Sequence, residues 1–317
     1  MVAGVGLAVH QHTLRQSGLT PNVPVAAPQF GGRLLYTRDG GLWTLNLADG
    51  VATEVAAAPE LGQVTAARWS PDGRSMVYAV HEVRNRRTPV STVIVAAADG
   101  SNPRPVVGSE DASTFYQLPA WARDGQHIYV VHTAQNVKRI EEVELATGVA
   151  KAVVDELGQF DVSPDGRWLV VARSTNTGIG LLLVDLATGA QRDLVGEQDF
   201  DLISSPRFDP GSQIILFTGA GRAGAQVSRS GGVGGLPGPE IALAHGIPMD
   251  LFSMPVGGGT PRRVARVNLD DPTTSWSPDG SNAALFSYEA LQIVRLADGS
   301  LTPLLTPGGF GSVDWAR

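Results

Sequence analysis

The sequence predicts an all-β fold, a six-bladed β-propeller of four-stranded antiparallel blades that occupies residues 30–317. Three observations lead to this prediction. One short turn sequence recurs along the chain, a second kind of tight turn alternates with it, and an apolar strand follows each copy of the first. Repeats with a period of about 40–50 residues are typical of propeller blades, each of which is one four-stranded sheet.

The first recurring turn is Ser-Pro-Asp-Gly, at 70–73, 163–166 and 277–280, with looser copies at 122–125 and 209–212. A large apolar residue leads each copy: Trp69, Trp121, Val162, Phe208 and Trp276. Serine suits the first position of a β-turn, proline the second because its φ is preset, and glycine relieves the left-handed geometry that follows. We therefore expect Asp72, Asp165 and Asp279 to bond to turn backbone rather than to act as functional carboxylates.

The second kind of turn marks the end of the third strand in each repeat. Its six copies are LADG at 47–50, AADG at 97–100, LATG at 145–148 and 186–189, VGGG at 256–259 and LADG at 296–299. Because these turns alternate with the first kind, six copies indicate six units and therefore six blades.

The unit that starts at Val64 shows the expected four strands: VTAARW at 64–69, SMVYAV at 75–80, STVIVAA at 91–97 and RPVV at 104–107. These short β-branched runs are bounded by Gly, Pro, Asp and Asn, as strands usually are. The second strands are almost wholly apolar, which predicts burial on both faces between neighbouring blades. We find no ten-residue segment with a convincing helical period.

The two ends of the chain predict how the ring closes. The first unit, at 32–55, lacks a leading strand, whereas GSVDWAR at 311–317 is a leading strand with nothing after it. We therefore expect the C-terminal strand to become the innermost strand of blade one. Such closure hides strand edges that would otherwise pair with other chains.

Residues 1–29 are interpreted as a tether or linker ahead of the propeller. Small apolar residues fill positions 1–9, about half of what a spanning helix needs, and no basic start marks a signal peptide. The segment is either the remnant of a membrane anchor or signal, or a frayed terminus. Residues 17–29 are rich in proline and predict an extended linker.

Composition excludes several classes of function. The formal net charge is −7 and the arginines are scattered, so nucleic acid is not expected as a partner. The chain has no cysteine, which excludes disulfides, thiolate nucleophiles and cysteine-ligated zinc.

The sequence Trp-Ser-Pro-Asp-Gly, at 69–73 and 276–280, followed by an apolar strand, resembles the propeller repeat of the TolB family. Related propellers cover the active site in the prolyl oligopeptidase family. The resemblance extends over residues 30–317 and implies a periplasmic protein that binds partners such as peptidoglycan-associated lipoproteins. The chain lacks the N-terminal α/β domain of TolB, so a role in the Tol system does not follow from the resemblance.

We find no motif that predicts catalysis, a cofactor or a metal. The nucleophile elbow of hydrolases, the Walker loop, the HExxH motif and the EF-hand loop are all missing. The glycine-rich stretch at 231–235 has no strand before it and no lysine, so it is interpreted as a loop. His81, His132 and His245 are expected toward one face, where a three-histidine metal site is the alternative to isolated polar residues.

Loop lengths differ between the two faces of the predicted disc. The Ser-Pro-Asp-Gly and Ala-Asp-Gly turns keep one face tight, and we call it the turn face. The opposite face, which we call the long-loop face, receives the segments 81–91 and 219–248. It also collects the candidate binding residues, which are Glu110, Asp111, Glu197, Asp199, Asp201, Asp270 and Asp271, with Arg84, Arg86 and Arg87 beside them. Functional residues concentrate on long loops of rigid scaffolds.

The leading interpretation is a non-catalytic scaffold that presents its long-loop face to a protein partner or a cell-envelope component. We expect it in the periplasm or elsewhere outside the cytoplasm, as a monomeric propeller within a complex. The alternative is a propeller enzyme, a lyase or hydrolase that acts at the axial pocket with a divalent metal ion. An enzyme needs several titratable groups that converge on one point.

Overall fold

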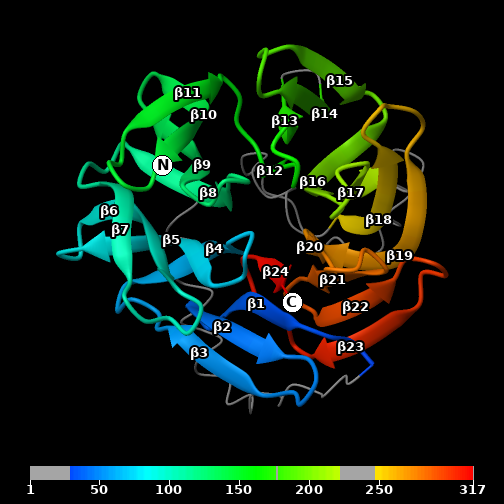
Figure 1. The fold of residues 1–317 in the computed structure, drawn as a ribbon, viewed down its shortest axis with the longest axis horizontal. Coiled ribbons are helices and arrows are strands. Elements are labelled where there is room, and N and C mark those ends of the chain that lie inside the picture. The colour runs from blue at the N-terminus through cyan, green and yellow to red at the C-terminus, as the bar shows by residue number, and fades with distance from the viewer. Residues whose placement is uncertain (1–28, 176–177, 222–246, 317) are drawn as a thin grey trace, which may run out of the picture.

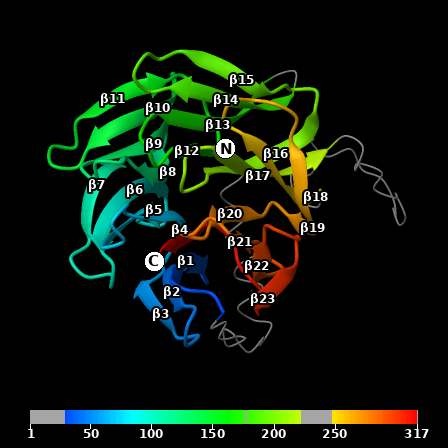
Figure 2. The same cartoon turned by 45° about the vertical axis from the view of Figure 1, so that its right-hand side comes forward.

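The computed structural model describes residues 29–175, 178–221 and 247–316. Within these ranges twenty-four strands form six four-stranded antiparallel sheets, and no helix occurs. Figure 1 shows the six sheets arranged as blades in a ring around one axis, and the tilted view in Figure 2 shows the same ring. The prediction of an all-β, six-bladed propeller is therefore confirmed.

The four strands of each blade run from the innermost, at the axis, to the outermost. Blade one contains β24 (Val313–Ala316), β1 (Arg33–Arg38), β2 (Gly41–Asn46) and β3 (Ala52–Ala56). Blade two contains β4 (Gly62–Trp69), β5 (Ser75–Arg84), β6 (Thr88–Ala97) and β7 (Arg104–Ser109). Blade three contains β8 (Phe115–Trp121), β9 (His127–Ala134), β10 (Val137–Glu144) and β11 (Ala150–Val154). Blade four contains β12 (Phe160–Val162), β13 (Trp168–Ser174), β14 (Ile179–Asp185) and β15 (Gln191–Val195). Blade five contains β16 (Phe200–Phe208), β17 (Ile214–Gly221), β18 (Pro248–Pro255) and β19 (Arg262–Asp270). Blade six contains β20 (Thr273–Trp276), β21 (Asn282–Phe286), β22 (Leu291–Arg295) and β23 (Leu301–Leu305).

The ring closes through the C-terminal strand, as predicted. β24 pairs antiparallel with β1, with Trp315 opposite Leu34 and Val313 opposite Tyr36. Trp315 is buried and meets the ring of Phe30 edge-on. Blade one is therefore built from both ends of the propeller, and its innermost strand comes from the last residues of the chain.

The core lies between the blades rather than inside them. Among the described residues, buried apolar side chains form six clusters, and each cluster joins two neighbouring blades. The second strands supply much of this core: Val77, Val130 and Val170 are all fully buried. The predicted burial of these strands on both faces is confirmed, and it follows from the packing of each blade against the next.

The recurring Ser-Pro-Asp-Gly turns have the predicted structure. In the first copy, the Gly73 amide donates to the Ser70 carbonyl at 2.8 Å, and Asp72 accepts from the Arg74 amide at 3.0 Å. Asp165 and Asp279 accept equivalent bonds from the amides of Arg167 and Ser281, both at 3.0 Å. These three carboxylates bond to turn backbone, as expected from the sequence.

The segment 81–91 differs from the expectation of a long loop. β5 and β6 remain paired up to Arg84 and Thr88, so the segment is an extended hairpin that turns at 85–87. Asn85 and Arg86 both have positive φ, of 50° and 57°. Asparagine favours such a turn, and its two left-handed residues match the twist of the flanking strands. Most of the second predicted excursion, at 222–246, lies outside the described residues.

Candidate functional site at the mouth of the channel

The innermost strands surround the axis of the disc, where each of them contacts the next around the ring. Three of them have irregular pairing with their neighbours: β4 between Val64 and Ala66, β8 between Gln117 and Ala120, and β16 between Ser204 and Arg207. Bulges of this kind re-aim side chains and are common next to functional sites. The irregular backbone therefore marks the axis as a candidate site.

Two residues in these bulges have left-handed backbone conformations. Leu118 has a φ of 51° and Ser205 a φ of 50°. Such conformations cost non-glycine residues on the order of 1–3 kcal/mol each, and they persist only where the surrounding structure holds them. The Ser205 amide is held by Gln159 Oε1 at 2.7 Å, and Ser205 Oγ accepts from the Thr274 amide at 2.8 Å. Contacts from blades four and six thus fix this bulge of blade five.

The bulges border a cavity at one mouth of the axial channel, which we call the channel pocket. Its volume is about 230 Å³. The lining residues come from five inner strands, from the ends of β19 and β21, and from the connections next to these strands: Thr65, Ala66, Arg68, Leu118, Pro119, Gln159, Phe160, Ser205, Asp270, Asp271, Thr273, Phe286, Ser287, Tyr288, Gly309, Phe310, Gly311 and Ser312. Because the β19–β20 and β21–β22 connections contribute, the pocket opens on the long-loop face.

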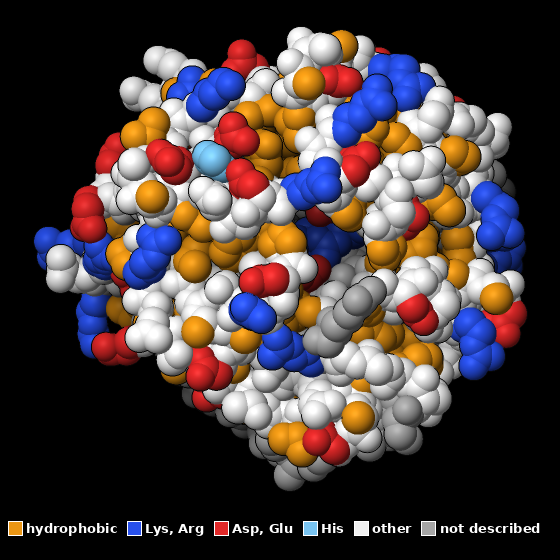
Figure 3. Space-filling model, viewed as in Figure 1, with side chains coloured by type: hydrophobic (Ala, Val, Ile, Leu, Met, Phe, Trp, Pro, Cys, Tyr) orange, Lys and Arg blue, Asp and Glu red, His pale blue; other side chains and the backbone are white. Residues whose placement is uncertain are grey.

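Four charged side chains form a network at the floor of the pocket and below it. Arg207 donates directly to Asp314 Oδ1, and its Nη1 lies 3.7 Å from Asp161 Oδ1. Arg68 Nη1 lies 3.8 Å from the same oxygen of Asp314. The network joins blades one, two, four and five across the axis. Figure 3 looks down the axis onto the turn face, opposite the mouth of the pocket, and shows a central hollow with basic and acidic side chains inside.

Burial changes the charge of this network. It raises the pKa of Asp161 from 3.8 to about 7, although Arg68 and the Phe208 amide oppose the change. Burial also raises the pKa of Asp314, against the opposing effects of Arg68 and the Trp69 amide. Both arginines stay charged at any physiological pH. With at least one carboxyl group partly protonated, the floor of the pocket carries a net positive charge at neutral pH and below.

Acidic side chains lie on the rim of the same pocket. Asp270 and Asp271 end β19 and begin the connection to β20, and both line the cavity. Asp271 Oδ1 accepts from Ser204 Oγ at 2.8 Å, and the Asp270 amide lies 3.4 Å from Glu289 Oε1. The pocket therefore combines an acidic rim with a basic floor.

An aromatic pair completes the rim. Tyr288 and Phe310 stack with their ring centroids 5.3 Å apart, and they remain 36% and 38% exposed. Tyr288 lies in the β21–β22 turn and Phe310 in the segment that leads into β24. Two large rings held in contact with solvent on one side provide a flat apolar surface next to charged groups.

The structure separates the predicted binding residues into two sets. Asp270 and Asp271 line the channel pocket, and the other eight do not. Glu110 is bound by Arg84, which also reaches Glu82 at 2.6 Å, so one arginine is shared between two glutamates. Asp111 accepts from the Ser113 amide and hydroxyl within its own connection.

The remaining predicted residues lie farther around the long-loop face. Glu197 lies 3.9 Å from Arg173, and Asp199 accepts from the Gly196 amide at 3.1 Å. Asp201 is exposed at the start of β16, and Arg86 and Arg87 are exposed at the tip of the blade-two hairpin. The structure thus gives local contacts to several of these side chains without bringing them together.

Sequence reasoning missed Arg68, Asp314, Tyr288 and Phe310. The two charged residues lie inside strand sequences, as RW at 68–69 and DW at 314–315. There they resemble the polar residues that alternate with apolar ones in an ordinary half-exposed strand. A usable signal was their position: each charge directly precedes the tryptophan of an innermost strand. Nothing in the sequence pairs Tyr288 with Phe310, because their contact depends on how blade six meets blade one.

The histidines do not assemble in the described part of the molecule. His132 Nδ1 lies 3.0 Å from Glu141 Oε1, and burial lowers the pKa of His81. His245 lies outside the described residues. Within the described ranges no group of three or more His, Asp or Glu side chains could hold a metal ion. No helix in those ranges is long and apolar enough to cross a membrane.

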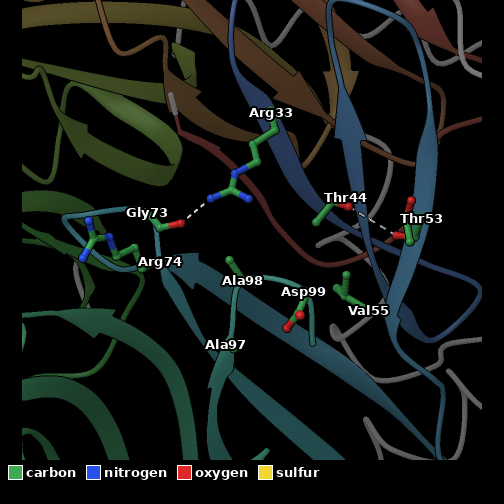
Figure 4. A pocket seen from close by; sticks show the side chains of 9 residues that line it. All are labelled: Arg33, Thr44, Thr53, Val55, Gly73, Arg74, Ala97, Ala98 and Asp99. Carbon is green, nitrogen blue, oxygen red and sulfur yellow. Dashed lines mark hydrogen bonds between the residues drawn. The ribbon is translucent and has the colours of Figure 1, made fainter. Parts of the chain in front are cut away.

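A second hollow, of about 570 Å³, lies between blades one and two and includes Gly73, Arg74 and Asp99 from turns of the turn face. Arg33 reaches across it to the Gly73 carbonyl (Figure 4). The Arg33 guanidinium also lies 4.2 Å from the centre of the Trp69 ring. Figure 4 also shows Arg74 directed away from the hollow. The charged groups of this hollow join two blades, so it is a weaker candidate than the channel pocket.

Comparison with known proteins gives similarity in structure only. No family model and no curated protein matches the sequence. Among solved structures, TolB from Acinetobacter baumannii matches with a TM-score of 0.69 at 13% identity, over 90% of this chain and 66% of that one. This chain therefore spans just under two thirds of that TolB chain. A structure of a nidogen/laminin complex matches with a TM-score of 0.67 at 12% identity, over 90% of this chain and 99% of that one.

An oligogalacturonate lyase in complex with manganese matches with a TM-score of 0.56 at 12% identity, over 89% of this chain and 76% of that one. Proteins as different as TolB, a protein of a nidogen/laminin complex and a lyase therefore share this architecture, and fold does not decide function. Identities this low establish the fold alone. Together with the six blades and the closing strand, they show that this chain has the fold of the TolB-like six-bladed β-propellers.

Proposed function

We propose that this chain is a non-catalytic binding scaffold that seats a protein or cell-envelope ligand on its long-loop face, over the channel pocket. The observation that carries the proposal is the stacked and exposed pair Tyr288 and Phe310 at the rim of a polar cavity. Aromatic rings around a cleft with a few placed polar groups are typical of binding sites. A rigid ring of six blades holds these groups in place without the ligand.

The acidic rim favours a partner with a basic surface. Asp270, Asp271 and Glu289 lie beside one another at the mouth, and walls of low dielectric strengthen the field of such a group. The structural similarity to TolB and to a nidogen/laminin complex supports protein binding outside the cytoplasm. In this proposal residues 30–317 are the binding domain, and residues 1–29 tether it.

The alternative, a lyase or hydrolase with a divalent ion, has support from the manganese-bound neighbour only. Such an enzyme needs several titratable groups at one point, with a ligand set for the ion. Among the residues that line the channel pocket, the two acids Asp270 and Asp271 lie at the rim, and the single arginine, Arg68, lies at the floor. This separation suits recognition of an extended charged ligand better than proton transfer at a single atom.

The test reverses charge on one face at a time. Purified protein, immobilised as bait, is incubated with an extract of the source organism, and bound proteins are quantified by mass spectrometry. We expect Asp270→Lys with Asp271→Lys to reduce capture of the partner about tenfold, and added salt to shrink the difference. The control is Asp49→Lys with Asp298→Lys, which reverses two exposed acids in turns of the opposite face.

Both pairs contain carboxylates that accept hydrogen bonds, within their own turns in the control pair and from β16 in the case of Asp271. Asp49 accepts from the Val51 amide and Asp298 from the Ser300 amide, whereas Asp271 accepts from Ser204. Melting temperature is measured for each variant to separate binding from unfolding. Loss of capture in the control pair alone, or equal capture by all three proteins, would contradict the proposal.

A further inference from the structure

We propose that the channel pocket binds a small zwitterionic group, with a carboxylate on the arginine floor and an ammonium group on the acidic rim. The inference rests on the proposed function, because it names the chemistry of what enters the same pocket. Arg68, Asp271 and Tyr288 carry it, since all three line one cavity and come from three different blades or connections.

The carboxylate end follows from Arg68. Asp314 is already bound by Arg207, by the Trp69 amide at 2.8 Å and by Ser275 Oγ at 3.2 Å. At 3.8 Å from Asp314, the Arg68 guanidinium is too far for a normal hydrogen bond. Among the described residues no group accepts a hydrogen bond from that guanidinium, and its side chain keeps 20% of its surface exposed. Its planar set of donors is suited to a carboxylate.

A second donor lines the same cavity as Arg68. Gln159 uses its carbonyl oxygen to accept from the Ser205 amide at 2.7 Å, which directs its amide nitrogen elsewhere. In the described ranges this nitrogen donates to no acceptor, and Gln159 lines the same cavity. The net positive charge of the floor adds to the attraction, because Asp161 and Asp314 do not fully neutralise the two arginines. An anion entering the pocket therefore meets directed donors and a favourable field.

The ammonium end follows from the rim. Asp271 uses Oδ1 to accept from Ser204, and its second carboxylate oxygen has no partner among the described residues. The exposed faces of Tyr288 and Phe310 lie at the same mouth, where they can cover an aliphatic chain or attract a cation. Charge thus changes sign from the floor to the rim, with apolar surface available beside the rim.

The size of the pocket limits the ligand. A cavity of about 230 Å³ is below the usual range of about 300–1,000 Å³ for drug-sized ligands. Each water molecule occupies about 30 Å³ in the liquid, so the volume of the pocket equals that of on the order of seven or eight water molecules. An amino acid, or the last residue of a peptide, is of this size.

The experiment uses three ligands that differ only in their ends: 6-aminohexanoate, hexanoate and hexylamine. Each is titrated into the purified protein by isothermal calorimetry. A ligand of about nine non-hydrogen atoms that makes both contacts binds with a Kd of about 10 mM or tighter. We expect 6-aminohexanoate to bind about tenfold tighter than either ligand with a single charge, because each charged contact contributes separately.

Variants then assign each end of the ligand. Arg68→Gln should weaken 6-aminohexanoate and hexanoate about tenfold to a hundredfold and leave hexylamine unchanged. Asp271→Asn should weaken 6-aminohexanoate and hexylamine and leave hexanoate unchanged. Arg74→Gln, on the opposite face, is the control and should change none of the three. If Arg68→Gln fails to fold, Arg68→Lys keeps the charge, and the loss of the planar donors alone should weaken hexanoate.

Two further ligands separate the sources of this chemistry. Free L-lysine and the peptide Gly-Gly-Lys both present a carboxylate and a side-chain ammonium. Tighter binding of the peptide assigns the pocket to the carboxyl terminus of a partner protein, and tighter binding of lysine assigns it to a free amino acid.

The inference is overturned if 6-aminohexanoate does not bind, if the three matched ligands bind equally, or if Arg68→Gln leaves hexanoate unaffected. The proposed function is tested separately, because it depends on capture of a partner by the whole face. Capture that depends on Asp270 and Asp271, together with no binding of these ligands, would refute the inference and leave the scaffold intact.

Discussion

Asp161→Asn tests whether the channel floor makes the stability of the fold depend on pH. Burial raises the pKa of Asp161 to about 7, above its ordinary value of 3.8. The folded protein therefore keeps a proton that the unfolded chain releases above about pH 4. The stabilising effect of this proton is complete below about pH 4 and is lost as the pH rises to about 7.

The size of the effect follows from the same two values. The interval from 3.8 to about 7, at about 1.4 kcal/mol per unit, amounts to about 4 kcal/mol. The ion pair with Arg207 at 3.7 Å favours the charged form of Asp161 and so reduces this figure. We therefore expect a loss on the order of 2–4 kcal/mol in the free energy of unfolding between about pH 4 and pH 7.

The measurement is urea unfolding from about pH 4.5 to pH 8 for the wild-type protein, Asp161→Asn and Asp165→Asn. Asp161→Asn should remove most of the slope, because asparagine cannot titrate. Asp165, in a turn of the same blade, has a lowered pKa because Ser163 and Arg167 bond to its ionised form, although burial opposes this effect. It titrates below this range, so its variant should keep the wild-type slope. Parallel curves for wild type and Asp161→Asn would refute the reasoning.

Three further predictions concern the scaffold. Trp276→Phe should lower the free energy of unfolding in urea by about 1 kcal/mol more than Trp69→Phe does. The Trp276 indole donates to a carbonyl of blade five at 3.1 Å, whereas the indole nitrogen of the buried Trp69 has no partner among the described residues. Equal losses in the two variants would contradict this prediction. Deleting 309–317 removes the inner strand of blade one, so we expect aggregation or a large fall in melting temperature, and a soluble truncation with unchanged melting would disprove the closure. Asp72→Ala and Asp279→Ala should each cost about 0.5–1 kcal/mol in thermal unfolding without affecting capture of a partner; loss of capture at normal stability would show that these turns bind.

The blades could be predicted from the sequence because their signals are local. A Ser-Pro-Asp-Gly turn determines its own geometry within four residues, and the apolar strand after it is buried wherever two blades meet. The hairpin at 81–91 departs from its prediction for a related reason. Its polar residues resemble those of a loop, yet β5 and β6 extend past the ring as a pair that needs no buried face. Backbone hydrogen bonds between two exposed strands do not require apolar side chains, so the hydrophobic pattern of the sequence does not indicate such a pair.

The site was only half predictable, since its contacts are set by the closure of the ring. Asp270 and Asp271 stand out as adjacent acids after a strand, and they do line the pocket. Arg68 and Asp314 are separated by most of the chain, and they meet only because β24 lies beside β4. A contact between residues so far apart in the sequence depends on the number of blades that close the ring, and no neighbouring residue in the sequence indicates it.

The same geometry makes ring closure and the pocket depend on each other. Asp314 lies on the closing strand and accepts from the Trp69 amide on β4, from Ser275 on β20 and from Arg207 on β16. A buried carboxylate with these partners fixes the position of β24 and holds Arg207 away from the cavity, while Arg68 keeps exposed surface in it. Asp314→Asn should therefore change both ligand binding and the free energy of unfolding. The Asp314 carboxylate holds β24 in the ring, and because it is bound by other donors it leaves the Arg68 guanidinium available to a ligand.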